Sequence, residues 1–138
     1  MSVRLDHVNM TVNNIDESIH WYQKIFGFEK VEGGLTPQGH PWAIIAIQDS
    51  MISMSEYQRI AADENKDTSA HRVYHFGFRI DDADQWRNKI RQHGLKLYYD
   101  GEIKYPHSRS WYVHDPSGHE IEVSCTDGGP LKFPSHPK

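Results

Sequence analysis

Apolar and polar residues alternate along residues 3–12, the first strand-like segment of the chain. Met10 and Val12 fall on one face of this segment, whereas His7 and Asn9 fall on the other. Because successive side chains of a strand point to opposite faces, the alternation is typical of a strand with one face on the core. We therefore predict a strand here, with His7 and Asn9 on the face away from the core.

A helix is predicted directly after this strand. Apolar residues from Ile15 to Phe26 recur every three or four positions, which is the spacing of one helix face. Asn14, with Glu17 three residues later, resembles a capping box, and Gly27 stands where a helix commonly ends. We expect the apolar stripe of this helix to cover the apolar face of a sheet.

Three more strand-like segments complete the first half of the chain: Glu29–Glu32, Trp42–Gln48 and Met51–Tyr57. Residues 58–71 are polar and lack strand periodicity, so they are predicted to form a linker loop. Residues 127–138 are rich in Gly and Pro and are predicted to form a flexible tail.

The pattern of strand, helix and three strands then starts again. The predicted elements of the second half are a strand at Tyr74–Ile80, a helix at Ala83–His93, and strands at Leu95–Tyr99, Arg109–His114 and Glu120–Cys125. His75 follows His7 by 68 positions and takes the equivalent place in its half. The predicted fold is α+β, with two βαβββ modules forming a cupped mixed sheet. One domain is expected over residues 1–126, with modules at about 3–57 and 72–126.

Bulk composition limits the classes of function. The 138 residues suffice for one domain with a core, and the formal net charge of −4 argues against nucleic acid or an anionic membrane as the main partner. No apolar run approaches the roughly 18 residues of a membrane span, and the N-terminus lacks the features of a signal peptide. The single cysteine, Cys125, excludes an internal disulfide and fits a reducing compartment, so a cytoplasmic protein is predicted.

Candidate metal ligands emerge from the repeat. His7 and His75 hold equivalent positions on the face that the helices do not cover, and two imidazoles with one carboxylate suit a divalent ion such as Fe(II), Mn(II), zinc or nickel. The carboxylate should come from a strand near the C-terminus. Glu122 and Glu120 share one face of the last predicted strand, so parity favours neither.

Three segments carry a resemblance to a known family: LDHVNMTVNNIDESIHWYQKIFGF, RVYHFGFRI and WYVHDPSGHEIEV. They resemble the vicinal oxygen chelate superfamily, which includes glyoxalase I, bleomycin resistance proteins, extradiol dioxygenases and fosfomycin-resistance thiol transferases. The similarity covers residues 4–125. It implies a metal bound by His7, His75 and Glu122, a homodimer, and a small-molecule substrate that chelates the metal through neighbouring oxygens.

The branches of this superfamily differ in what surrounds the metal. Glyoxalase I has a fourth ligand, a glutamate near the end of the fourth strand, for which Glu56 is the candidate. Glu56, however, shares strand parity with the apolar Ile52 and Met54, which places Ser53 toward the metal unless a bulge shifts the register. Parity therefore favours an open position for water or substrate, with Ser53 in contact with the substrate.

Resemblance also implies roles for residues near the C-terminus. In the dioxygenase branch, Tyr112 matches a substrate-binding tyrosine ten residues before the ligand glutamate, and His107 is the candidate acid/base group. In the thiol-transferase branch, Ser110 matches a substrate contact and Asn9 replaces a threonine. The basic C-terminal arginine of that branch has no counterpart here, which leaves Arg109 as the candidate to bind an anionic group.

Two classes of function follow. The first is a metal-dependent enzyme acting on a small oxygen-rich substrate, by dioxygenase-like or fosfomycin-type thiol-transferase-like chemistry. The second is a metal-free small-molecule binding protein of the bleomycin-resistance type. The three matching ligands favour the enzyme, and three ligands rather than four favour these reactions over a glyoxalase I-like lyase.

Overall fold

The computed structural model describes residues 1–58 and 71–128 of the chain. These residues form two compact units, the first ending at residue 58 and including Asp115–Ser117, the second spanning the remaining described residues from 71 onward. Each unit runs strand, helix and three strands, as the repeat in the sequence predicts. The predicted linker and tail lie almost entirely outside the described residues.

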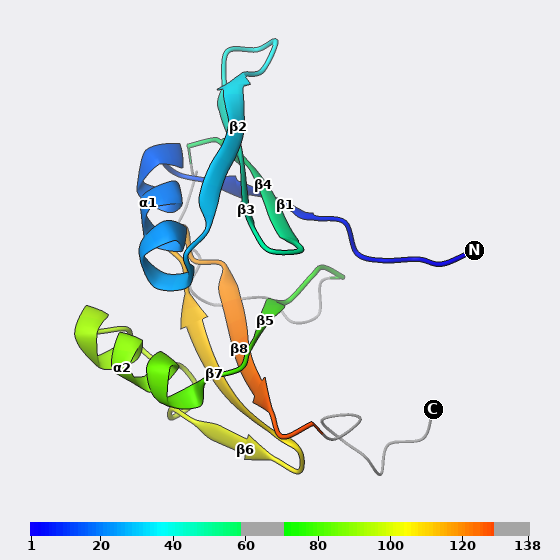
Figure 1. Cartoon of the computed structure of the whole chain (residues 1–138). Coiled ribbons are helices and arrows are strands. Elements are labelled where there is room, and N and C mark those ends of the chain that lie inside the picture. Colours follow the sequence, from blue (N-terminus) through cyan, green and yellow to red (C-terminus); the bar gives the residue numbers. More distant parts are fainter. Residues whose placement is uncertain (59–70, 129–138) are drawn as a thin grey trace. The chain divides into compact units, whose positions relative to one another are not determined.

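The first unit is a four-stranded mixed sheet with one helix beside it (Figure 1). Its elements are β1 (Val8–Val12), α1 (Ile15–Phe26), β2 (Glu29–Leu35), β3 (Pro41–Ile47) and β4 (Ser50–Glu56). The strands lie in the order β1-β4-β3-β2, with β1 parallel to β4 and the other pairs antiparallel. Helix α1 connects β1, at one edge of the sheet, to β2 at the other edge, and these two strands run in the same direction.

Local chemistry sets both ends of α1. The side chain of Asn14 accepts a hydrogen bond from the backbone N–H of Glu17 at 2.9 Å, and Gly27 ends the helix in the left-handed conformation. The buried stripe of α1 includes Tyr22 and Ile25, which pack in the core of this unit with residues such as Val12. Burial of this stripe stabilises the helix more than intrinsic propensity does.

The second unit repeats the same topology. Its elements are β5 (Phe76–Ile80), α2 (Ala83–His93), β6 (Ile103–Tyr105), β7 (Ser108–His114) and β8 (Glu120–Thr126). The strands lie in the order β5-β8-β7-β6, with β5 parallel to β8. The buried Trp86 of α2 and Trp111 of β7 mark the side of the sheet on which α2 packs, and the Arg87 guanidinium lies 5.6 Å from the Trp111 ring centroid. The predicted α+β class with two βαβββ modules is confirmed.

The prediction of a strand at Leu95–Tyr99 is wrong. This segment has no regular secondary structure, and the strand that pairs with β7 is Ile103–Tyr105. Between them the backbone turns through Tyr99, Asp100 and Gly101, all with positive φ. Extended backbone has negative φ, so three such residues in succession end any strand there.

Two predicted strands are shorter than expected at their N-terminal ends. β1 begins at Val8 and β5 at Phe76, so His7 and His75 each directly precede a strand. Within β1 the alternation is as predicted, with Met10 and Val12 buried. Among the described residues, no helix is long and apolar enough to cross a membrane.

Candidate metal centre

Polar side chains gather on the face of the second sheet that α2 does not cover. Alternation along β7 places Trp111 on the α2 side, and therefore Ser110 and Tyr112 on the opposite face. Across the β7–β8 ladder, Tyr112 pairs with Glu122. This uncovered face carries the carboxylates of β8 beside hydroxyl groups of β7.

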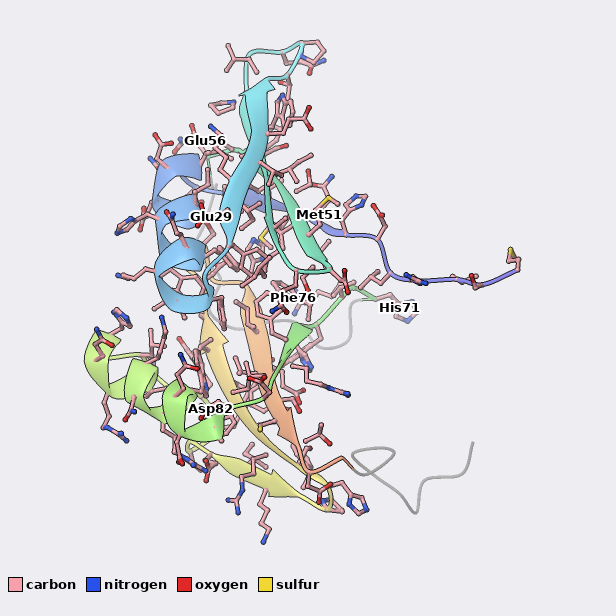
Figure 2. The ribbon with its side chains drawn as sticks, in the orientation of Figure 1. Glu29, Met51, Glu56, His71, Phe76 and Asp82 are labelled. Atoms are coloured by element: carbon pink, nitrogen blue, oxygen red, sulfur yellow. The ribbon has the colours of Figure 1, made fainter. Side chains whose placement is uncertain are left out.

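His75 lies between the two carboxylates of β8. Its Nε2 atom is 3.2 Å from Oε1 of Glu122, and its Nδ1 atom is 3.3 Å from Oε2 of Glu120. The parallel register of β5 with β8, in which Phe76 pairs with Ile121, brings the preceding His75 beside Glu120. Both ring nitrogens of His75 are therefore engaged by different carboxylates. In Figure 2, Phe76 marks the start of β5, directly after His75.

The two carboxylates differ in their partners. The side chain of Glu120 is 3% exposed, accepts a hydrogen bond from the Tyr99 hydroxyl at 2.5 Å, and lies 3.6 Å from Nε2 of His114. The side chain of Glu122 is 10% exposed and accepts a hydrogen bond from the Ser110 hydroxyl at 2.7 Å through Oε2. The other oxygen of Glu122, Oε1, is the one that faces the imidazole.

Tyrosine side chains surround this pair. The Tyr112 and Tyr105 hydroxyls are 3.1 Å apart, and the Tyr112 ring meets the rings of His75 and Tyr99 edge to face. Burial, followed by the hydrogen bond with Tyr105, raises the pKa of the Tyr112 hydroxyl above its ordinary value. The hydrogen bond to Glu120 is the main cause that raises the pKa of Tyr99. Both hydroxyls are therefore protonated near neutral pH and can donate hydrogen bonds.

The remaining predicted ligand, His7, belongs to the first unit. Its side chain is 44% exposed, and Nδ1 lies 2.8 Å from a carboxylate oxygen of Asp6. Asn9 and Ser53, predicted to contact the substrate, pair with each other across β1 and β4 of the same unit. The structure thus brings together His75 and Glu122 in one unit, and Asn9 and Ser53 in the other.

Glu56 lies on the α1 side of its sheet. Its Oε1 atom accepts a hydrogen bond from the backbone N–H of Ile15, the first residue of α1, at 2.9 Å. Figure 2 labels Glu56 near the start of this helix. This agrees with its parity, since Ile52 and Met54 on the same face of β4 are buried. The carboxylate occupies the position in which an anion stabilises a helix N-terminus.

His107 and Arg109, also predicted as site residues, lie away from His75 within the second unit. His107 occupies the turn between β6 and β7, with Nδ1 3.4 Å from Asp127. It precedes Tyr112 by five strand positions, about 17 Å at the rise of a strand. Arg109 shares the parity of Trp111 and binds Glu102 at 3.3 Å, so its guanidinium lies on the α2 side.

Three residues of the uncovered face, His114, Tyr105 and Tyr99, were not among the predicted site residues. His114 could have been found by extending the parity of Ser110 and Tyr112 along β7, whereas Tyr105 lies on β6, a strand that was not predicted. Tyr99 reaches Glu120 from a turn with positive φ, and no periodicity signals such a position. In neither unit do the described residues bring three or more His, Cys, Asp or Glu side chains into an arrangement that would hold a metal ion. The His75–Glu122 pair therefore supplies two donors, not a complete ligand set.

A model of the Glyoxalase/Bleomycin resistance protein/Dioxygenase superfamily matches residues 4–123. The chain belongs to this superfamily. The resemblance in its histidine and DPSGHEIE segments is thereby confirmed, and solved structures of the superfamily share its fold. A glyoxylase/bleomycin resistance protein/dioxygenase domain from Frankia sp. EAN1pec superposes with a TM-score of 0.77 at 17% identity, over 94% of this chain and 96% of that one.

Two further relatives have named activities, and solved structures of a fosfomycin resistance protein hold a metal. The chain is 26% identical to the trivalent organoarsenical cleaving enzyme of Bacillus sp. (strain MD1), over 95% of this chain and 78% of that protein. It is 25% identical to the metallothiol transferase FosB of Staphylococcus epidermidis, over 86% of this chain and 79% of that protein. The fold also resembles that of a mutant fosfomycin resistance protein, FosX from Listeria monocytogenes, which was solved with Mn(II) and 1S,2S-dihydroxypropylphosphonic acid. The TM-score is 0.69 at 20% identity, over 96% of this chain and 97% of that one.

Proposed function

We propose that this chain is a metal-dependent enzyme of its superfamily acting on a small oxygen-rich substrate. The observation that carries the proposal is the approach of His75 Nε2 to Glu122 Oε1, 3.2 Å apart on the uncovered face of the second sheet. Imidazole nitrogen and carboxylate oxygen are donors that suit divalent first-row metals. His7 is proposed as the third ligand, and the working protein as a homodimer.

A metal held by this pair would act as a Lewis acid toward an oxygen of the substrate. The Mn(II) in the FosX complex supports a divalent ion, and Fe(II), zinc and nickel use the same donors. The Ser110 hydroxyl fixes one oxygen of Glu122, which orients the other toward His75. The protonated Tyr112 hydroxyl is the proposed hydrogen-bond donor to a substrate oxygen. Asn9 and Ser53 are proposed substrate contacts from the first unit.

The relatives' names suggest two substrates, and the residues present argue against simple transfer of either. Arg109 binds Glu102 on the α2 side, so it does not offer a cation to a phosphonate on the uncovered face. The other named substrate is a trivalent organoarsenical, and soft elements such as arsenic favour thiolate ligands. This chain has only one cysteine, Cys125. Dioxygenase-like chemistry on an oxygen-rich substrate is therefore the first candidate, and thiol transfer to an epoxide, as the likeness to FosB suggests, is the second.

Metal analysis tests the proposal directly. Protein purified without chelator should carry a divalent metal, and its removal should lower the melting temperature, because a ligand that binds only the folded state stabilises it. His75→Ala should abolish metal binding. His107→Ala is the matched control, since it removes an imidazole from the same unit at the far end of β7. No metal in the wild type, together with unchanged melting of His75→Ala, would instead support a metal-free binding protein.

Two assays then separate the reactions. Anaerobically prepared protein with Fe(II) is supplied with catechols and oxygen, and protein with Mn(II) is supplied with a thiol and an epoxide. Turnover in the first assay that is lost in His75→Ala supports dioxygenase-like chemistry. Turnover only in the second, with the same loss, supports thiol transfer and replaces the first candidate.

A further inference from the structure

His75 is held at both ring nitrogens, and the proposed function uses only one of them. Nε2 faces Glu122, the proposed metal ligand, whereas Nδ1 lies 3.3 Å from Oε2 of Glu120. Sequence parity alone left Glu120 and Glu122 as equal candidates for the ligand. Their surroundings assign them different tasks.

Glu120 is the more deeply buried carboxylate of the pair. Burying an ionised carboxylate is costly unless hydrogen bonds and opposite charges compensate it, so such a group is fixed by its partners. Tyr99 donates to Oε1 at 2.5 Å, while Oε2 faces His75. Because its two oxygens point toward different partners, Glu120 is held between the Tyr99 hydroxyl and the imidazole.

We propose that Glu120 is a positioning residue that holds the His75 ring with Nδ1 toward Glu120 and Nε2 toward Glu122. An imidazole that donates from Nδ1 to a carboxylate presents its lone pair at Nε2, the nitrogen beside Glu122. Carboxylates that receive the second N–H of a metal-bound histidine fix its ring orientation and strengthen it as a ligand. The inference rests on the proposed function, since it assigns Glu120 a task toward the same metal.

Tyr99 extends this network by one step. Its φ of 58° is a left-handed conformation that non-glycine residues seldom adopt, and it places the hydroxyl on Glu120. Local strain of this kind persists where surrounding contacts hold it in place. In the proposed network, Tyr99 fixes Glu120, Glu120 fixes His75, and His75 with Glu122 receives the metal.

The experiment measures tautomer and metal affinity separately in the full-length chain. Glu120→Leu removes the acceptor while filling the space, and Glu120→Gln keeps an acceptor oxygen. In zinc-loaded protein, two-bond ¹H–¹⁵N spectra report which nitrogen of His75 binds the metal and which one carries the proton, with His75→Ala giving the assignment. We expect wild type and Glu120→Gln to be protonated on Nδ1, and Glu120→Leu to lose this preference.

Calorimetric titration with Mn(II) should show about 10- to 100-fold weaker binding for Glu120→Leu and a smaller loss for Glu120→Gln. Glu102→Leu is the control, because Glu102 pairs with Arg87 and Arg109 on the α2 side. The Kd of this variant for Mn(II) should stay within about twofold of the wild-type value. If Glu120→Leu does not fold, Tyr99→Phe replaces it, with the same tautomer readout and a loss of a few-fold.

The outcomes distinguish the two proposals. Wild-type affinity in Glu120→Leu, or an unchanged His75 tautomer in that variant, overturns the role of Glu120 and leaves the metal centre standing. A wild type that binds no Mn(II), Fe(II), zinc or nickel overturns the proposed function.

Discussion

At the scale of single residues, Glu56 bears on the number of protein ligands in the proposed metal centre. Its carboxylate accepts a hydrogen bond from the N–H of Ile15 and so occupies the N-terminus of α1. Ser53, on the opposite face of β4, pairs with Asn9 across the sheet. A carboxylate engaged at a helix terminus is not free to ligate a metal, which agrees with the proposal of three protein ligands and an open position.

Replacement of Glu56 tests this assignment. Glu56→Ala should lower the free energy of unfolding by about 1 kcal/mol, because it removes an acceptor and a negative charge from the start of α1. The Kd for Mn(II), measured by calorimetry, should be unchanged. Glu32→Ala, on the exposed strand β2, is the control for a lost surface charge and should leave both quantities as in the wild type. A clearly weaker Mn(II) affinity in Glu56→Ala would restore Glu56 as a fourth ligand.

Strand alternation separates two of the predicted site residues. Ser110 and Arg109 are adjacent on β7, so both cannot face the same ligand, and the structure places them on opposite faces. The alternation of side chains along β7 therefore implies that Ser110 and Arg109 cannot both contact the same substrate. Glu120 and Glu122 share a face, and only the three-dimensional contacts with Tyr99 and Ser110 separate their roles.

At the scale of elements, the helices are the best-predicted parts of the fold. Asn14 and Asp82 precede α1 and α2, Gly27 and Gly94 follow them, and each of these signals lies within a few residues of the helix end. β6 was missed because its pairing with β7 depends on the turn at residues 99–101, and neighbouring residues do not specify that turn. Local signals thus sufficed for helices and for well-patterned strands, but not for this short strand.

Capping of α2 gives a prediction at this scale. The side chain of Asp82 accepts a hydrogen bond from the backbone N–H of Gln85 at 2.9 Å. Asp82→Ala should lower the free energy of unfolding by about 1 kcal/mol, because the helix loses an N-cap acceptor. Asp81→Ala, at the neighbouring exposed position, should change it by less than about 0.5 kcal/mol. Urea unfolding followed by circular dichroism measures both, and equal losses would show that net charge, not capping, is responsible.

At the scale of the whole molecule, residues far apart in the sequence complete the first unit. Tyr22 of α1 donates a hydrogen bond to a carboxylate oxygen of Asp115 at 2.7 Å, and both residues are buried. Ser117 accepts from the backbone N–H of Asn13 just before α1. Asp115–Ser117, between β7 and β8, therefore belong to the first unit, although they lie in the second module of the sequence.

This buried pair makes stability sensitive to alkaline pH. Burial, together with the neighbouring Asp115 carboxylate, raises the pKa of Tyr22 far above its ordinary value near 10. Below about pH 10 the tyrosine is protonated in both states, so its contribution to stability is fully present. As the pH rises further, the unfolded chain releases the proton and the folded chain retains it. Stability should then fall by about 1.4 kcal/mol per pH unit from this one residue.

Denaturant unfolding of wild type and Tyr22→Phe between pH 8 and about pH 11 measures this effect. At pH 8 the variant should be less stable by about 1–3 kcal/mol, because Asp115 loses a buried hydrogen-bond donor. The difference in free energy of unfolding between the wild type and Tyr22→Phe should narrow above pH 10, because phenylalanine has no proton to lose in the unfolded state. Tyr57→Phe, at a largely exposed position, should keep a constant difference from the wild type. If the gap for Tyr22→Phe is also constant, Tyr22 does not remain protonated in the folded protein, and its hydrogen bond to Asp115 is not what ties this segment to α1.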